Sequence, residues 1–257
     1  MGKGNGNGCS NGILFVVGTG PGSLEYMTPA VRTAIEKSDI VIGYQRYLEQ
    51  VQSLIEDKEV MSSSMMQEVD RVQAAIRKAE EGQTVALISG GDPGIYGMAG
   101  LVYDIAAEKK SRVAIQVVAG IPALNSCAER LGAPLMHDFC SISLSDLLTP
   151  WELIENRVEA AASADFVIVI YNPKSKKRRW QLARTCKIIE QYRKRDTPVG
   201  IVKAATREQE EVTITTLEQL QFAHVDMQST VIVGNSMSYV WRGKMITPRG
   251  YLKKYAI

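Results

Sequence analysis

The chain has 257 residues, 45% of them hydrophobic and 23% charged, so it is long enough for one large or two modest domains with proper cores. Lysine and arginine (30) nearly balance aspartate and glutamate (28), which gives no overall reason to expect a nucleic-acid partner. The four cysteines are scattered without a CxxC pair and there are two histidines, so no metal site is expected.

Residues 1–12, MGKGNGNGCSNG, lack the apolar core of a signal peptide and are rich in Gly and Asn, so we expect a disordered tail there. No apolar run of the sequence reaches the length that spans a membrane. We therefore expect a soluble, cytoplasmic protein with free thiols and no membrane partner.

The first predicted strand, residues 13–17, is an apolar run typical of a strand buried on both faces, and the turn GTGPG follows it. A dinucleotide-binding fingerprint needs a third glycine where Ser23 stands, and an acidic residue after the next strand, 39–44, which ends in Gly-Tyr. NAD is therefore not expected as the cofactor. Thr28 is predicted to cap the following helix, with Pro29 at its first position.

Residues 64–67, SMMQ, form a predicted capping box in front of a helix. The apolar residues at helical spacing in this segment are Met66, Val69, Val72, Ile76 and Ala79. Residues 84–89, TVALIS, are then predicted as a buried strand, and residues 98–108 as another helix.

The loop GGDPGIYG, residues 90–97, separates that strand from that helix and is too rich in Gly and Pro for a helix to run through it. Its glycines lack β-carbons, which leaves room for another molecule against the backbone, and Asp92 is its one charged side chain. The alternative is an ordinary strand-to-helix turn with Asp92 as a helix cap.

A third glycine-bearing strand end, after a predicted buried strand, occurs in VAIQVVAG, residues 113–120. Parallel α/β sheets bind ligands at the carboxyl ends of their strands, so three such ends predict a bound small molecule.

From about residue 136 the sequence is richer in strand patterns, with alternation in ISLSD and EVTITTL, which predicts a mixed, partly antiparallel sheet. Helices are predicted at 151–162 and 177–194. We therefore expect an α/β protein with an N-terminal domain at 13–135 on a mostly parallel sheet. A C-terminal domain at 136–257 is expected on a mixed sheet, and helices should flank both sheets.

The motifs VVGTGPG, ISGGDPGIYG, AGIPALNS and HDFCSISLSDLLTPW, in that order, resemble the S-adenosylmethionine-dependent tetrapyrrole methyltransferases of corrin and sirohaem synthesis. The segments LMHDFCSISLSDLLTPWELI and VIYNPKSKKRRWQL resemble the branch that methylates C17 of precorrin-3B or cobalt-precorrin-3 and contracts the ring, in cobalamin biosynthesis. The resemblance implies a homodimer of two-domain subunits, with a tetrapyrrole substrate and S-adenosylmethionine, which becomes S-adenosylhomocysteine, in the cleft between the domains.

The resemblance also implies the positions that contact the cofactor. They are Pro21, Gly90, Gly91, Asp92, Ile95, Pro122, Ala123, Asn172, Ala205 and Gly234. The chain departs from the family pattern at Pro122 and Ala123, which replace a Ser/Thr and a small residue.

Methyl transfer from a sulfonium to an electron-rich carbon depends mainly on positioning, whereas ring contraction also requires proton transfers. The candidate catalytic residues are His137, Asp138, Ser145 and Asp146, and Thr149 is a candidate substrate contact. The alternatives are a loop histidine bonded to backbone, and serines on the polar face of an alternating strand.

The basic run KSKKRR, residues 174–179, precedes a predicted helix, where positive charge opposes the helix dipole and a bound anion would be favourable. We expect Lys176, Lys177, Arg178 and Arg179 to bind the substrate's carboxylates. A solvated face is the alternative, and RNA phosphate would suit the same side chains.

Other functions compatible with these patterns are a related methyltransferase acting on another tetrapyrrole position, on RNA or on a modified protein residue, and a tetrapyrrole carrier without catalysis. A nucleotide-dependent oxidoreductase is disfavoured by the incomplete fingerprint.

Overall fold

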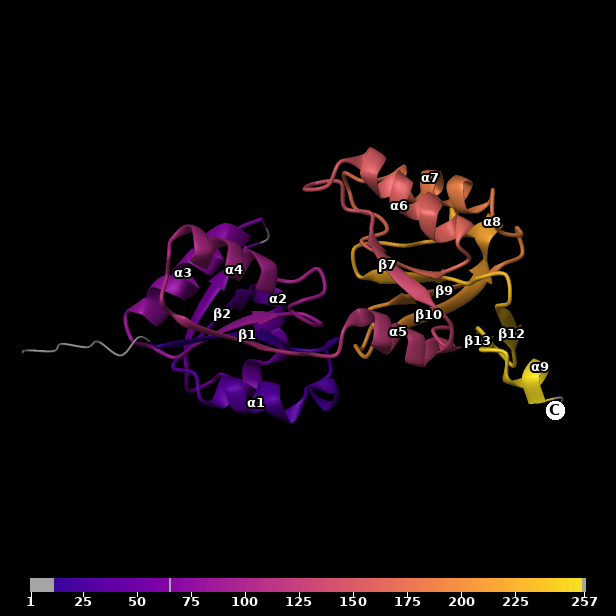
Figure 1. Cartoon of the computed structure of the whole chain (residues 1–257). Helices are drawn as coiled ribbons and strands as arrows, with labels where there is room; N and C mark the ends of the chain where they lie inside the picture. The colour runs from indigo at the N-terminus through magenta and orange to yellow at the C-terminus, as the bar shows by residue number, and fades with distance from the viewer. Residues whose placement is uncertain (1–11, 65, 256–257) are drawn as a thin grey trace, which may run out of the picture. The chain divides into compact units, whose positions relative to one another are not determined.

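The computed structural model describes residues 12–64 and 66–255, which form two compact units, one ending at Pro122 and the other beginning at Ala123 (Figure 1). The predicted tail lies outside the described residues except for Gly12, whose N–H donates to the Ala79 carbonyl at 2.8 Å. The predicted boundary after residue 135 is wrong, because helix α5 (Ala123–Leu131) packs on the second sheet.

Among the described residues, the first unit has a sheet of five parallel strands in the order β3-β2-β4-β1-β5. The strands are β1 (Ile13–Gly18), β2 (Ile40–Tyr44), β3 (Glu59–Ser63), β4 (Val85–Ser89) and β5 (Ala114–Val118). The apolar runs of β1, β2 and β4 occupy its centre, as strands buried on both faces must. The predicted burial of β5 is wrong, because β5 forms an edge and exposes Gln116 and Val117. The polar edge strand β3 was not predicted.

Helices cover both faces of this sheet (Figure 1). They are α1 (Pro29–Glu36), α2 (Gln45–Gln50), α3 (Glu68–Glu80) and α4 (Ala99–Glu108), with short 3-10 turns at Leu24–Tyr26 and Gln52–Leu54. One core contains side chains of α1 and α2, and the opposite core contains those of α3 and α4. The start of α1 is confirmed: Pro29 is its first residue, and the Thr28 hydroxyl accepts the Val31 N–H at 3.3 Å.

The predicted capping box in front of α3 forms only in part. The Gln67 side chain accepts the Ser64 N–H at 2.8 Å, but the helix begins at Glu68, so Ser64 is not its N-cap residue. Met66 lies outside the helix with φ of +68° and is exposed, so its predicted place on the buried helix face is wrong. Val72, Ile76 and Ala79 are buried as predicted, whereas Val69 is exposed.

Among the described residues, the second unit has a mixed sheet of five strands in the order β10-β9-β11-β8-β7. The strands are β7 (Phe139–Ser143), β8 (Val167–Tyr171), β9 (Pro198–Lys203), β10 (Glu211–Thr216) and β11 (Ser229–Val233). Strands β7 and β8 are parallel, and the other pairings are antiparallel. A small sheet that the sequence did not reveal joins β6 (Gly132–Ala133), β12 (Tyr239–Trp241) and β13 (Lys244–Ile246).

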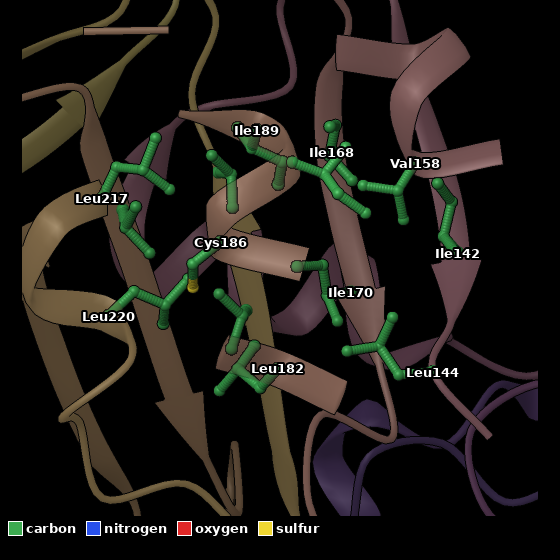
Figure 2. Packing of buried hydrophobic residues seen from close by; sticks show 14 of the residues in the cluster. Ile142, Leu144, Val158, Ile168, Ile170, Leu182, Cys186, Ile189, Leu217 and Leu220 are labelled. Carbon is green, nitrogen blue, oxygen red and sulfur yellow. The ribbon is translucent and has the colours of Figure 1, made fainter. Parts of the chain in front are cut away.

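Helices α6 (Trp151–Ser163), α7 (Gln181–Ile189) and α8 (Leu217–Leu220) cover one face of the second sheet, and a short helix, α9 (Tyr251–Tyr255), follows the small sheet. Figure 2 shows the core that these helices share with the strands, with Ile142, Leu144, Val158, Ile168, Ile170, Leu182, Cys186, Ile189, Leu217 and Leu220 labelled. Helix α5 packs against β9, β10 and β11. A β-carbon on Gly200 of β9 would lie 2.3 Å from the Leu131 side chain, so this close packing requires the glycine. In the described part of the chain no helix has the length and apolarity to cross a membrane.

Candidate functional site

The first unit contains a topological switch point between the neighbouring strands β1 and β4. The chain leaves β1 towards α1 on one face of the sheet, and leaves β4 towards α4 on the other. Gly20 and Gly91 join the two exits through paired backbone hydrogen bonds of 3.1 and 2.7 Å. Open α/β sheets bind ligands at the carboxyl ends of strands at such a point, and the predicted cofactor contacts Pro21, Gly90 and Gly91 lie here.

The glycines of these strand exits accommodate the chain itself. A β-carbon on Gly120 would lie 2.2 Å from the Gly91 carbonyl oxygen and 2.3 Å from that of Gly18, so the ends of β1, β4 and β5 meet backbone to backbone. Gly91 also has a φ of +65°, which strains any other residue. A β-carbon on Gly90 would lie 2.5 Å from the Tyr47 ring. Close contacts within the chain therefore account for these glycines, which we expected from the sequence to leave space for another molecule.

Asp92 ties the glycine-rich loop to the end of β5. Its Oδ1 accepts the Gly94 N–H at 2.8 Å, and its Oδ2 accepts the Gly120 N–H at 3.1 Å. The alternative in which Asp92 caps a helix is wrong, because α4 begins at Ala99. Each carboxylate oxygen can accept more than one hydrogen bond, so Asp92 can still accept one from a hydroxyl or an amino group. Ile95 is half-buried in the same loop.

The exits of β7, β8 and β9 share one edge of the second sheet, because β7 is parallel to β8, and both β8 and β9 are antiparallel to β11. This carboxyl edge brings Ser145, Asn172 and Ala205 to the same end of the sheet. The Ser143 hydroxyl accepts hydrogen bonds from the Asn172 side-chain amide at 2.9 Å and from the Ser145 N–H at 3.2 Å. Asn172 has a φ of +50°, which asparagine tolerates better than most residues.

Arg178 is a buried part of this edge, with 7% of its surface exposed. Its Nε donates to the Asn172 carbonyl at 3.1 Å, and its Nη2 contacts the Met227 sulfur at 3.3 Å. Burial lowers the pKa of the Arg178 guanidinium below its ordinary value, and the Asp146 carboxylate acts in the opposite direction. Arg178 was expected to bind the substrate's carboxylates with its basic neighbours, but its guanidinium is buried and bonded within the chain, whereas Lys176 and Lys177 are exposed.

Asp146 lies in the loop between β7 and α6, where its Oδ2 accepts the side-chain N–H of Gln181 at 2.8 Å. Gln181 is the first residue of α7, so this hydrogen bond joins two connections of the carboxyl edge. Thr149 is half-buried in the same loop, and Arg179 is exposed next to Arg178.

The turn after β9 is held by Glu210. Its carboxylate accepts the Thr206 N–H and pairs with Arg130 of α5 at 2.9 Å. Burial acts to raise the pKa of Glu210, but the Thr206 amide and the Arg130 guanidinium outweigh it and leave that pKa below its ordinary value. Ala204 and Thr206, on either side of the buried Ala205, have φ of +48° and +66°, so this pairing stabilises a strained turn.

His137 and Asp138 lie at the opposite, amino edge of the second sheet. They precede β7, and the Asp138 carbonyl accepts the N–H of Val167 at the start of β8. A strand of five residues is about 17 Å long, so the structure separates these two residues from Ser145 and Asp146. The His137 Nδ1 accepts the Asp138 backbone N–H at 2.8 Å, whereas the Asp138 carboxylate is 3.9 Å from that nitrogen, beyond hydrogen-bond distance.

Gly234 also lies at the amino edge. It follows β11, which runs against β9, and its N–H donates to the carbonyl of Pro198 at the start of β9. A β-carbon on Gly234 would lie 2.6 Å from the Ser238 side chain, which accounts for the glycine. The structure therefore does not bring Gly234 together with Asn172 and Ala205.

Pro122 and Ala123 stand at the junction of the two units, with Ala123 as the first residue of α5. The hydroxyl of Tyr171, the last residue of β8, accepts the Leu124 N–H at 2.9 Å and so places the start of α5 at the carboxyl edge. Sequence reasoning missed Tyr171, Gln181 and Glu210, each of which acts on a residue distant in the sequence. Within the described residues no group of three or more His, Cys, Asp or Glu side chains is placed to hold a metal ion.

The fold and its glycine-rich strand exits are those of an α/β protein that binds a ligand at the switch point of a parallel sheet. The family model of the tetrapyrrole (corrin/porphyrin) methylases matches residues 14–221, and the chain belongs to this family. The resemblance drawn from the sequence motifs is therefore confirmed.

The chain is also similar to individual members of this family. The chain is 52% identical to a cobalt-factor III methyltransferase of Priestia megaterium over 96% of its own length, but spans 46% of that relative. It is 50% identical to a probable cobalt-factor III C(17)-methyltransferase of Salmonella typhimurium, covering 93% of this chain and 99% of that one. The crystal structure of the methyltransferase CobJ is similar with a TM-score of 0.87 and 32% identity, over 92% of this chain and all of that one.

Proposed function

We propose that the chain is an S-adenosylmethionine-dependent methyltransferase of cobalamin biosynthesis. It methylates C17 of a tetrapyrrole, either precorrin-3B or cobalt-precorrin-3, and contracts the ring. The observation that carries the proposal is the 50% identity to the Salmonella relative, which this chain matches over 99% of the relative's length. The similarity to CobJ over that protein's whole chain supports it.

The residues present fit such a cofactor. In the first unit, Pro21, Gly91 and Asp92 surround the switch point, where the Asp92 carboxylate can accept hydrogen bonds from hydroxyl and amino groups. In the second unit, Asn172 and Ala205 share the carboxyl edge. Gly90 and Ile95, from the same loop as Asp92, and Pro122 and Ala123, at the start of α5, complete the proposed set. Gly234 is left out, because it lies at the amino edge.

S-adenosylmethionine supplies an electrophilic methyl group, so no covalent bond to a protein side chain is needed. The protein's contribution is to hold the reactants in place, an effect that supplies roughly 7–11 kcal/mol in well-oriented systems. A rigid edge suits this role, because Asn172, Ser143 and Arg178 are joined by hydrogen bonds of 2.9 and 3.1 Å.

The proton transfers of ring contraction are assigned to the carboxyl edge, where Ser145 and Asp146 lie close to the proposed cofactor contact Asn172. His137 and Asp138 lie at the other edge and become the second candidates for this role. The exposed Lys176, Lys177 and Arg179, together with Thr149, are the proposed contacts for the substrate's carboxylate groups.

Calorimetric titration of the purified protein with S-adenosylhomocysteine and with NAD tests the cofactor. Saturable binding of S-adenosylhomocysteine and no response to NAD are expected. NAD binding without a response to S-adenosylhomocysteine would overturn the proposal. Tetrapyrrole binding without methyl transfer would identify a carrier, and transfer to RNA another member of the family. The homodimer and the cytoplasmic location stay predictions. Analytical sedimentation, which measures the mass of the assembly in solution, tests the homodimer.

A further inference from the structure

The loop between β7 and α6 presents two adjacent leucines at the carboxyl edge of the second sheet. Leu147 and Leu148 expose 73% and 93% of their surfaces. Single exposed apolar residues are common, but neighbouring ones at the sheet edge that carries the proposed cofactor contact Asn172 suggest a binding surface. Trp180, at the start of α7, is also 53% exposed.

These side chains are held in place. The loop is anchored at Ser145, whose N–H donates to Ser143, and at Asp146, which accepts a hydrogen bond from Gln181. At the end of the loop, the rings of Trp151 and Trp180 meet edge to face, with centroids 4.9 Å apart. The β7–α6 loop and the segment before α7 therefore form one continuous surface.

The segment before α7 adds positive charge to that surface. The Arg178 N–H donates to the Ser175 hydroxyl and the Ser175 N–H to the Arg178 carbonyl, both at 3.0 Å, which fixes a tight turn. This turn buries Arg178 and leaves Lys176, Lys177 and Arg179 exposed. None of these three forms a salt bridge with another residue in 12–64 or 66–255.

We propose that this surface recognises the tetrapyrrole substrate, with Leu147, Leu148 and Trp180 against the flat apolar ring and the three exposed cations on its peripheral carboxylates. The proposal rests on the proposed function and extends it by assigning the ring-binding side chains. A flat ring edged with carboxylates matches an apolar patch flanked by exposed cations in both shape and charge. Asp146 is the acidic side chain of the loop, and its hydrogen bond with Gln181 and its proximity to Arg178 limit its repulsion of the ligand.

The test is spectrophotometric titration of the full chain with cobalt-factor III, together with calorimetric titration with S-adenosylhomocysteine. The double variant Leu147→Ser/Leu148→Ser should bind the tetrapyrrole at least tenfold more weakly, which corresponds to about 1.4 kcal/mol. Its melting temperature and its affinity for S-adenosylhomocysteine should stay unchanged. A second variant, Lys176→Gln/Lys177→Gln/Arg179→Gln, should also bind more weakly and with a smaller dependence on salt.

Phe222→Ser is the matched control, because Phe222 is 75% exposed and follows α8, near the amino edge. It should bind the tetrapyrrole as the wild type does. Wild-type affinity in the double leucine variant would overturn the inference and leave the proposed function intact. A changed sedimentation mass with unchanged tetrapyrrole affinity would also overturn it, by assigning the leucines to a contact between copies. A wild type that binds S-adenosylhomocysteine and no tetrapyrrole would overturn both.

Discussion

Replacing the buried Arg178 by methionine should destabilise the protein, although Arg178 lies in a run of basic residues. Methionine fills a similar volume beside Met227 but donates no hydrogen bond to Asn172. A hydrogen bond from a charged group contributes about 1.5–3 kcal/mol, so the free energy of unfolding should fall by that amount. At roughly 2–4 °C per kcal/mol for a chain of this size, the melting temperature should fall by about 3–12 °C. The exposed Arg179→Met should change stability by less than about 0.5 kcal/mol.

The same substitution should weaken cofactor binding, because the Asn172 carbonyl loses the donor that helps hold its backbone at a φ of +50°. Loss of one net hydrogen bond corresponds to a roughly two- to tenfold rise in the Kd for S-adenosylhomocysteine. Scanning calorimetry and isothermal titration measure the two effects, and Arg178→Lys should be intermediate. Equal melting temperatures and equal Kd values for the Arg178→Met variant and the wild type would refute the positioning role.

Three further substitutions test other parts of the structure. Glu210→Gln should lower the free energy of unfolding at pH 7 by roughly 1–2 kcal/mol. Because the folded pKa of Glu210 is lowered, its contribution to stability is present above the unfolded pKa of about 4.3 and is lost as pH falls through the folded pKa. Urea melts should therefore show the difference in stability between the wild type and the variant disappearing in acid. Gly91→Ala should lower the free energy of unfolding by about 1–2 kcal/mol, because Gly91 has a φ of +65°. Gly100→Ala, with open space around it in α4, should raise the free energy of unfolding by up to about 1 kcal/mol. Equal melting temperatures for the two variants would contradict the strain argument. Asp146→Asn should reduce ring contraction relative to methylation more than His137→Ala does in single-turnover product analysis, and the reverse order would return the acid/base role to the amino edge.

Local patterns predicted the elements of the fold well. Thr28 and Pro29 determine the start of α1 through interactions within one turn, and the apolar runs of β1 and β4 are long enough to indicate central strands. The edge strand β3 and the small sheet of β6, β12 and β13 were not predicted, because short, exposed strands carry little apolar pattern.

The site was harder to predict because sequence proximity does not give direction in space. His137 and Ser145 are eight positions apart and belong to one motif, yet β7 lies between them and places them at opposite edges. Gly234 follows a strand just as Gly90 does, but β11 is antiparallel, so its exit faces the amino ends of its neighbours. The burial of Arg178 within a basic run depends on its turn with Ser175, which charge pattern alone does not reveal.

The most direct test of the proposed function is to incubate the purified chain with methyl-labelled S-adenosylmethionine and precorrin-3B or cobalt-factor III, and to analyse the tetrapyrrole by mass and absorption spectrum. We expect one labelled methyl group to enter the macrocycle and the spectrum to change to that of a contracted ring. If the protein binds S-adenosylhomocysteine but neither substrate acquires the label, the proposed function is contradicted.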